Sequence, residues 1–222
     1  SVSSKSIWLQ PVRAAKAVAT PGLLLFVFFM LVALTPISII ILTKTSYYNN
    51  YTYAGILELV GWGITIGLSL PSIEPPLLLA GATSREIWRI AMVIACAATA
   101  LTALGMGCCA ILDIATGRTE VFGVYMIPHT GIGPSLWFLV PLGTFPGVLA
   151  SACVSMANRY LDLRRTAAIV TPTILLMNPI SFLIIPHALR TGLLGYVVYL
   201  LAAALAYPFL LRFILSRPRN EE

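Results

Sequence analysis

The sequence predicts an all-α membrane protein with six transmembrane helices. Of the 222 residues, 59% are hydrophobic and only 10% are charged, whereas soluble domains average about 25% charged residues. Hydropathy separates six apolar stretches of about 17–24 residues, close to the ~20 that a helix needs to cross a ~30 Å hydrocarbon core. We expect these spans at residues 21–43, 54–70, 88–111, 135–156, 166–185 and 193–215.

The basic residues sort to one side of this predicted topology. Eleven of the 14 Lys and Arg residues lie in the N-terminal arm, after the second and fourth spans and at the C-terminal end. They are Lys5, Arg13, Lys16, Arg85, Arg89, Arg159, Arg164, Arg165, Arg212, Arg217 and Arg219. The other side holds Lys44, Arg118 and Arg190. The positive-inside rule therefore predicts that both termini lie in the cytoplasm. We expect the membrane to be the plasma membrane.

Three segments make up the predicted domain organisation. Residues 1–20 mix Trp8 and other apolar side chains with basic ones, which favours an amphipathic helix on the cytoplasmic membrane surface. A loose basic arm is the alternative. Residues 21–215 form the six-helix transmembrane domain, whose first span we interpret as a retained helix and not a cleaved signal peptide. Residues 216–222 form a cytoplasmic tail.

Composition and motifs argue against several function classes. The net charge of +6 is spread over short segments that the orientation rule already explains, so we expect no nucleic-acid partner. No connection is long enough for a soluble catalytic domain of about 50 residues. The sequence has neither a His-Glu-x-x-His zinc-protease motif nor a Gly-x-x-x-x-Gly-Lys-Ser/Thr phosphate loop. It also lacks the Gly-x-Ser-Gly nucleophile of a rhomboid protease. We therefore expect no catalytic residue and no nucleotide site in this chain.

Four cysteines lie inside the apolar spans: Cys96, Cys108, Cys109 and Cys153. Thiols in membrane helices are usually small packing residues, so we expect all four to be free. Cys108 and Cys109 are adjacent and would point in different directions on a helix, which suits a shared metal ion poorly. The sequence therefore predicts no metal site.

Small residues predict where helices approach one another closely. Gly63 and Gly67 are four residues apart in the second span, a spacing that lets another helix backbone come near. The third span has a longer stripe of small residues: Ala91, Ala95, Thr99, Ala103 and Gly107. We expect this stripe to form one flat face over about four turns, and so to place the third span inside a tight bundle.

Three residues are candidates for a transport pathway. Glu58 is the only acid that we place clearly within an apolar span; it either lines a pathway or reaches the membrane interface. Asn178 precedes Pro179 in the middle of the fifth span. It either contributes to the pathway or hydrogen-bonds to a neighbouring helix or to the carbonyl groups that a kink at Pro179 frees. Prolines in the fourth and fifth spans predict kinks. Such breaks are typical of pathway linings but occur equally as structural kinks.

The connection between the second and third spans, Pro71–Arg89, is unusually elaborate. We expect its three prolines to stop the membrane helix and Leu77–Ala80 to form a short helix along the membrane surface. A Gly-Ala hinge follows, and Thr83 or Ser84 would then cap the next helix, with Glu86 in its first turn. This mixture of apolar and charged residues favours docking of another protein.

Two patches of the sequence resemble the membrane subunits of ABC exporters of the type-2 permease family. In Leu78–Trp88, leucines and small residues precede Thr83, Ser84 and Arg85, which is similar to that family's turn into the third span. Asn158–Arg165 is similar to its second cytoplasmic turn. The layout agrees along nearly the whole chain, but the short connection Pro186–Gly192 departs from relatives that carry outer gate helices there.

The resemblance implies a function and a set of partners. Two permease subunits, identical or related, would form the pathway, and two ATPase subunits would bind ATP and Mg, so that this chain binds no cofactor. The apolar spans favour a hydrophobic or amphipathic cargo: a drug, a lipid or an antimicrobial peptide. The residues implied in coupling to the ATPase are Glu74, Leu78, Arg85, Glu86, Arg89, Arg164 and Arg165. A stand-alone carrier or channel, and a membrane enzyme or its anchor subunit, remain as alternatives.

Overall fold

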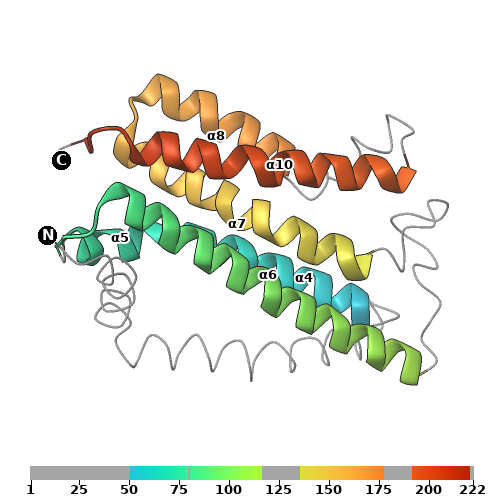
Figure 1. The fold of residues 1–222 in the computed structure, drawn as a ribbon. Coiled ribbons are helices and arrows are strands. Elements are labelled where there is room, and N and C mark those ends of the chain that lie inside the picture. Colours follow the sequence, from blue (N-terminus) through green and yellow to red (C-terminus); the bar gives the residue numbers. More distant parts are fainter. Residues whose placement is uncertain (1–50, 80, 117–135, 178–191, 221–222) are drawn as a thin grey trace, which may run out of the picture.

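The computed structural model describes residues 51–79, 81–116, 136–177 and 192–220 (Figure 1). Every regular element in these ranges is a helix, which confirms the predicted all-α class. The helices are α4 (Tyr51–Leu68), α5 (Leu70–Leu79), α6 (Ser84–Ala115), α7 (Leu136–Tyr160), α8 (Leu163–Met177) and α10 (Gly192–Leu215). The predicted surface helix at 1–20 and the predicted first span at 21–43 lie outside the described residues.

Three of the described helices, α6, α7 and α10, are long and apolar enough to cross a membrane. They correspond to the predicted third, fourth and sixth spans. The 32 residues of α6 correspond to a length of about 48 Å, more than the ~30 Å hydrocarbon core requires. The predicted second span corresponds to α4, and the described part of the predicted fifth span to α8. The chain is therefore a helical membrane protein.

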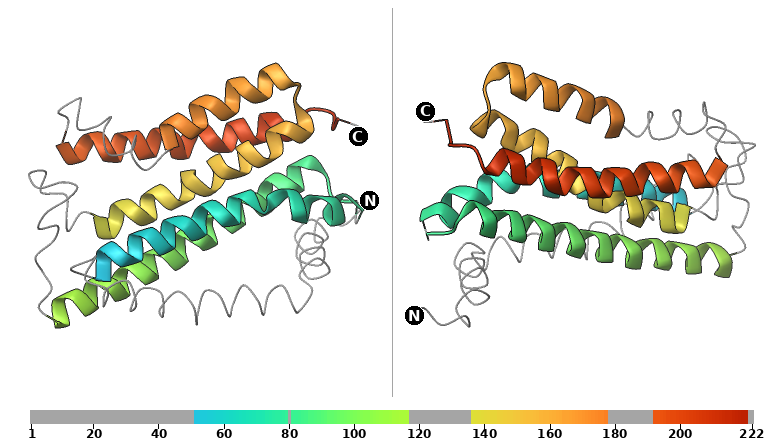
Figure 2. Two further views of the ribbon diagram at one scale, coloured as in Figure 1. Left: turned by 180° about the vertical axis from the view of Figure 1, so that it is seen from behind. Right: turned by 45° about the horizontal axis from the view of Figure 1, so that its top comes forward.

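Helix α7 lies at the centre of the bundle. Each of the other described helices packs against it. Helices α4 and α6 lie on one side of α7, and α8 and α10 lie on the other, as Figures 1 and 2 show from different directions. A movement of α7 would therefore change its contacts with all the other helices at once.

The predicted close approach at Gly63 and Gly67 is confirmed, and the partner is α7 of the same chain. A Cβ atom added at Gly67 would lie only 2.6 Å from the Ser151 Cβ atom, and one added at Gly63 would lie 3.4 Å from the Thr144 side chain. The Ser155 hydroxyl also donates to the Gly67 carbonyl, at 3.3 Å. Glycine is thus required at Gly67, where the backbones of α4 and α7 cross, whereas a Cβ atom at Gly63 would make an ordinary van der Waals contact.

The predicted small-residue face of the third span is only partly correct. Ala91 and Ala95 are buried, but Ala103 and Gly107 are exposed. A repeat of four residues advances about 40° per step around a helix, so the stripe drifts off the packed face over four steps. The buried face of α6 instead follows spacings of four, four and three residues. It consists of Ile87, Ala91, Ala95, Ala98, Thr102, Met106, Cys109 and Asp113.

Helix α4 ends just before the three prolines, as predicted, but the last two prolines do not interrupt the helix that follows. Helix α4 ends at Leu68, and α5 then includes Pro71, Pro75 and Pro76. The break falls at Ser69, whose hydroxyl donates to the Ile66 carbonyl at 2.7 Å. Pro71 lies in the first turn of α5, where a backbone N–H has no partner within the helix, so proline is tolerated there. The short helix is therefore longer than the predicted Leu77–Ala80.

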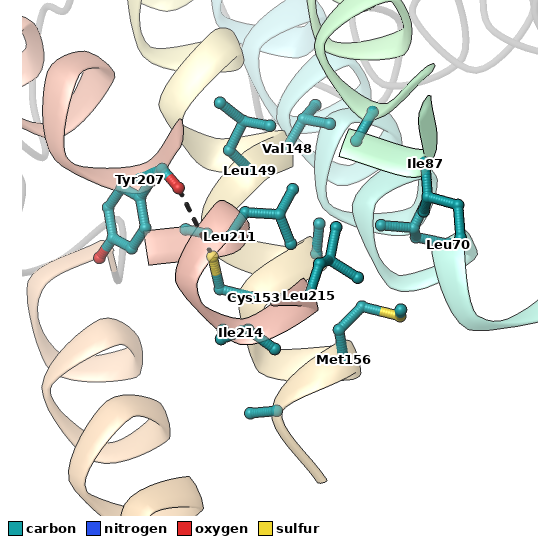
Figure 3. Packing of buried hydrophobic residues seen from close by; sticks show 14 of the residues in the cluster. Leu70, Ile87, Val148, Leu149, Cys153, Met156, Tyr207, Leu211, Ile214 and Leu215 are labelled. Carbon is teal, nitrogen blue, oxygen red and sulfur yellow. Dashed lines mark hydrogen bonds between the residues drawn. The ribbon is translucent and has the colours of Figure 1, made fainter. Parts of the chain in front are cut away.

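The largest hydrophobic core joins α7 to the C-terminal half of α10, with contributions from α5 and α6 (Figure 3). Cys153 lies in this core, with its sulfur 3.8 Å from the Tyr207 carbonyl oxygen. All four cysteines are free thiols. Cys108 is exposed and Cys109 is buried, as expected for neighbours on one helix.

Candidate functional site

All described basic residues gather at one end of the bundle. Three segments meet there: α5 with the start of α6, the corner between α7 and α8, and the end of α10 (Figures 1 and 2). We call residues 70–89, 158–165 and 212–220 the basic end. It carries Arg85, Arg89, Arg159, Arg164, Arg165, Arg212, Arg217 and Arg219. The two connections that the sequence predicted to share one face thus lie at the same end.

The turn from α5 into α6 is held in a fixed conformation. Gly81 adopts a φ of 80°, a left-handed conformation that favours glycine. Its N–H donates to the Leu78 carbonyl, and the Ala82 N–H donates to the Leu77 carbonyl, both at 2.9 Å. This pair of hydrogen bonds is the Schellman arrangement, which satisfies carbonyl groups at a helix C-terminus.

Thr83 caps the next helix, as predicted. The Glu86 N–H donates to the Thr83 hydroxyl at 3.4 Å, and the Thr83 N–H donates to the Glu86 carboxylate at 2.7 Å. This reciprocal pair is a capping box, which satisfies two donors that have no partner inside the helix. The Glu86 carboxylate, expected to contact a partner protein, therefore has a structural partner in its own chain.

Glu74 lies inside the protein. It falls on the same face of α5 as Leu70 and Leu77, and all three residues are buried. The Glu74 carboxylate accepts a hydrogen bond from Arg159 at 3.0 Å, which is also an ion pair, and a second from the Tyr160 hydroxyl. The resemblance implied that Glu74 docks on an ATPase or transmits motion from it. In this structure the Glu74 side chain is 0% exposed and therefore offers no surface for a direct contact.

The contacts of Glu74 tie α5 to the last turn of α7. A buried carboxylate is costly unless it is paired and hydrogen-bonded, and the Glu74 side chain is 0% exposed. The Arg159 side chain is 32% exposed, so part of its guanidinium group keeps access to the surroundings. The cluster of Glu74, Arg159 and Tyr160 thus fixes the position of the short helix on the central helix.

The remaining predicted coupling residues differ in exposure. Arg85 is exposed, whereas Leu78 and Arg89 are half-buried. Two leucines that the sequence did not single out project strongly from the basic end: Leu79 is 89% exposed and Leu163 is 81% exposed. Such large apolar side chains at a polar end are typical of a contact with a partner or with lipid.

The corner between α7 and α8 carries Arg164 and Arg165, both exposed. Asp162 caps α8, since its carboxylate accepts the Arg165 N–H at 2.8 Å. The same carboxylate lies 3.7 Å from the Arg165 guanidinium group, and both side chains are more than half exposed. Exposed pairs of this kind contribute about 0–1 kcal/mol to stability.

The C-terminal segment after α10 is attached to this corner. The Asn220 N–H donates to the Arg159 carbonyl at 2.9 Å, and its side-chain amide donates to the Leu161 carbonyl at 3.0 Å. The sequence predicted a tail here without assigning it any contact. Within α10, the Pro208 carbonyl accepts a hydrogen bond from the Trp88 indole at 2.8 Å, which ties α10 to α6.

A second buried acid lies at the opposite end of the bundle. The sequence placed the end of the third span at Ile111, so Glu58 was taken as the only acid within a span. Helix α6 continues to Ala115 and includes Asp113, which is 3% exposed. Its carboxylate accepts the N–H of Tyr51, the first residue of α4, at 2.6 Å. A negative charge is favourable at a helix N-terminus.

The three candidate pathway residues cannot be placed in this site. Glu58 lies on α4, but its side chain is outside the described residues, as are Asn178 and Pro179. Within the described ranges, no three His, Cys, Asp or Glu side chains are grouped so that they could hold a metal ion.

Comparison of the chain with family models, curated proteins and solved structures finds no match.

Proposed function

We propose that the chain is the permease subunit of an ATP-driven ABC exporter in the plasma membrane. A separate ATPase subunit docks on the basic end, which faces the cytoplasm together with both termini. One observation carries this proposal: α5, a short helix between two bundle helices, is exposed on one face and is tied on its other face to the central helix by the pair Glu74–Arg159.

The exposed face of α5 and the following turn have the composition of a protein-binding surface. Ser72, Pro76 and Leu79 are exposed along α5, and Arg85 is exposed at the start of α6. Exposed leucine and arginine side chains are common in protein interfaces, where the apolar side chain fills a pocket and the arginine binds a carboxylate. The resemblance of Leu78–Trp88 to the ATPase-contacting turn of type-2 permeases concerns the same residues.

The buried pair supplies the mechanical connection. A force on the outer face of α5 would act on Glu74, and through Arg159 on the last turn of α7. Because all the other described helices pack against α7, its displacement would alter the whole bundle. Glu74 then transmits motion, while Arg85 and Leu79 make the contact.

The proposal includes partners that hold the nucleotide and complete the pathway. Two ATPase subunits bind ATP and Mg, and a second permease subunit, identical or related, contributes the other half of the pathway. The buried side chains of the described helices are largely apolar, which favours a hydrophobic or amphipathic cargo such as a drug, a lipid or an antimicrobial peptide.

Co-purification tests the docking surface. The tagged chain is purified in mild detergent from the cells that naturally produce it, as wild type, Leu79→Ser or Leu194→Ser. Both leucines are strongly exposed, at 89% and 72%, but at opposite ends of the bundle. We expect Leu79→Ser alone to reduce the recovered ATPase. Failure of the wild-type chain to recover any ATPase would contradict the proposed function.

A further inference from the structure

Four exposed arginines lie where the C-terminal segment meets the α7–α8 corner. Arg164 and Arg165 begin α8, and Arg217 and Arg219 follow α10. The two hydrogen bonds of Asn220, to the carbonyl groups of Arg159 and Leu161, hold the C-terminal segment against the corner. The orientation rule requires basic charge on this side but no fixed position for it. The orientation rule therefore does not explain why the basic C-terminal segment is held against the equally basic α7–α8 corner, where their like charges repel each other.

The positive charge of this corner is only partly neutralised within the described residues. Asp162 is the acid of the corner, and it already accepts the Arg165 N–H and pairs with its guanidinium group. Glu74 is buried against Arg159. Among the described residues, the corner therefore keeps an excess of guanidinium groups, which bind phosphate through paired hydrogen bonds more readily than other cationic side chains do. Glu221 and Glu222, which follow Asn220 in the sequence, lie outside the described residues.

Apolar side chains lie directly beside these arginines. Leu163, the first residue of α8, is 81% exposed, and Phe213, in the last turn of α10, is 42% exposed. The Arg217 guanidinium carbon lies 4.6 Å from the centre of the Phe213 ring. Because α10 is long and apolar enough to cross a membrane, its last turn lies where hydrocarbon gives way to headgroups. The arginines can bind the anionic headgroup of a lipid, and the exposed apolar side chains beside them can contact its acyl chains.

We propose that the α7–α8 corner and the C-terminal segment together bind the headgroup of an anionic phospholipid. The phosphate lies among Arg164, Arg165, Arg217 and Arg219, and the glycerol and upper acyl groups contact Leu163 and Phe213. This site does not depend on the proposed transport function. It gives Arg164 and Arg165 a role in lipid binding in place of the ATPase contact that the resemblance implies. The adjacent apolar side chains favour a lipid over an acidic protein.

Lipid retention by the full chain tests the site. The purified protein is titrated with phosphatidylglycerol or phosphatidylcholine in detergent micelles, and bound lipid is counted by native mass spectrometry. Each arginine near an anionic headgroup contributes about fivefold in affinity, so Arg217→Gln with Arg219→Gln should raise the dissociation constant for phosphatidylglycerol about 25-fold. The control, Arg85→Gln with Arg212→Gln, removes the same charge elsewhere at the basic end and should have little effect.

A second variant separates a built site from general charge attraction. Asn220→Ala keeps every charge but removes the side-chain hydrogen bond to Leu161, and we expect it to weaken phosphatidylglycerol binding several-fold. Equal losses in the two double variants, or equal binding of phosphatidylcholine and phosphatidylglycerol by the wild type, would overturn the proposal. A third result would also overturn the proposal: the Arg217→Gln, Arg219→Gln variant binds lipid as the wild type does but no longer recovers the ATPase. That result would identify a protein-binding surface.

Discussion

Removal of Arg159 should destabilise the protein more than removal of the charge on Glu74. Arg159→Met keeps much of the side-chain volume but removes the positive charge that pairs with the fully buried Glu74 carboxylate. Within this cluster, the carboxylate then keeps only its hydrogen bond from Tyr160. Stranding one charge of a buried pair costs about 3–5 kcal/mol of unfolding free energy. Glu74→Gln leaves an amide that can still accept from Tyr160, and Arg159 is partly exposed, so we expect a loss of only about 1–2 kcal/mol.

The double variant makes the argument quantitative. In Glu74→Gln combined with Arg159→Met, no buried carboxylate remains to be stranded, so the double variant should be more stable than Arg159→Met alone. The measurement is unfolding by SDS in mixed micelles, followed by far-ultraviolet circular dichroism. Arg165→Met serves as the control, because its pair with Asp162 is exposed and contributes at most about 1 kcal/mol. Additive losses in the double variant would refute the stranded-charge account.

Two further predictions concern helix contacts elsewhere in the bundle. Gly67→Ala places a Cβ atom into the backbone of α7 and should lower the free energy of unfolding by about 1–3 kcal/mol in the same assay. The control is Gly61→Ala, whose added Cβ atom would have nothing within 4 Å and should be neutral or stabilising. Equal effects of the two substitutions would contradict the close crossing. Asp113→Ala removes the buried acceptor of the first N–H of α4 and should lower stability by about 1–3 kcal/mol, and Asp113→Asn by less. Hydrogen exchange at the start of α4 should increase in Asp113→Ala, and unchanged exchange would show that the contact does not hold the helix end.

Local patterns in the sequence predicted the features that depend on neighbouring residues. The cap at Thr83 needs only Glu86 three positions later, and the close approach at Gly67 follows from small residues four positions apart. The cap was predicted correctly because its cause lies within one helical turn. The small residues predicted that a helix packs closely at Gly67, but they did not say that the partner is α7. The sorting of arginines to one end likewise follows from a rule that counts charges in short connections.

Features that depend on contacts between helices could not be predicted in the same way. The spacing of Leu70, Glu74 and Leu77 puts an acid on an apolar face, which signals a buried carboxylate. That signal does not say that Arg159, among eight described arginines, is its partner. Asp113 was missed because hydropathy ended the span at Ile111, whereas α6 continues to Ala115 and Asp113 contacts the start of α4. The small-residue stripe failed because its period of four differs from the 3.6 residues of a helical turn.

ATP hydrolysis by the assembled complex tests the central claim most directly. The wild-type chain and the Glu74→Gln variant are each reconstituted with the ATPase subunit in lipid vesicles, and the hydrolysis rate is compared with that of the ATPase alone. Since Glu74 is buried while the proposed docking face of α5 is exposed, the variant should still recover the proposed ATPase partner but lose most of the stimulation that the wild-type chain gives. Full stimulation by the Glu74→Gln complex would contradict a coupling path through this ion pair.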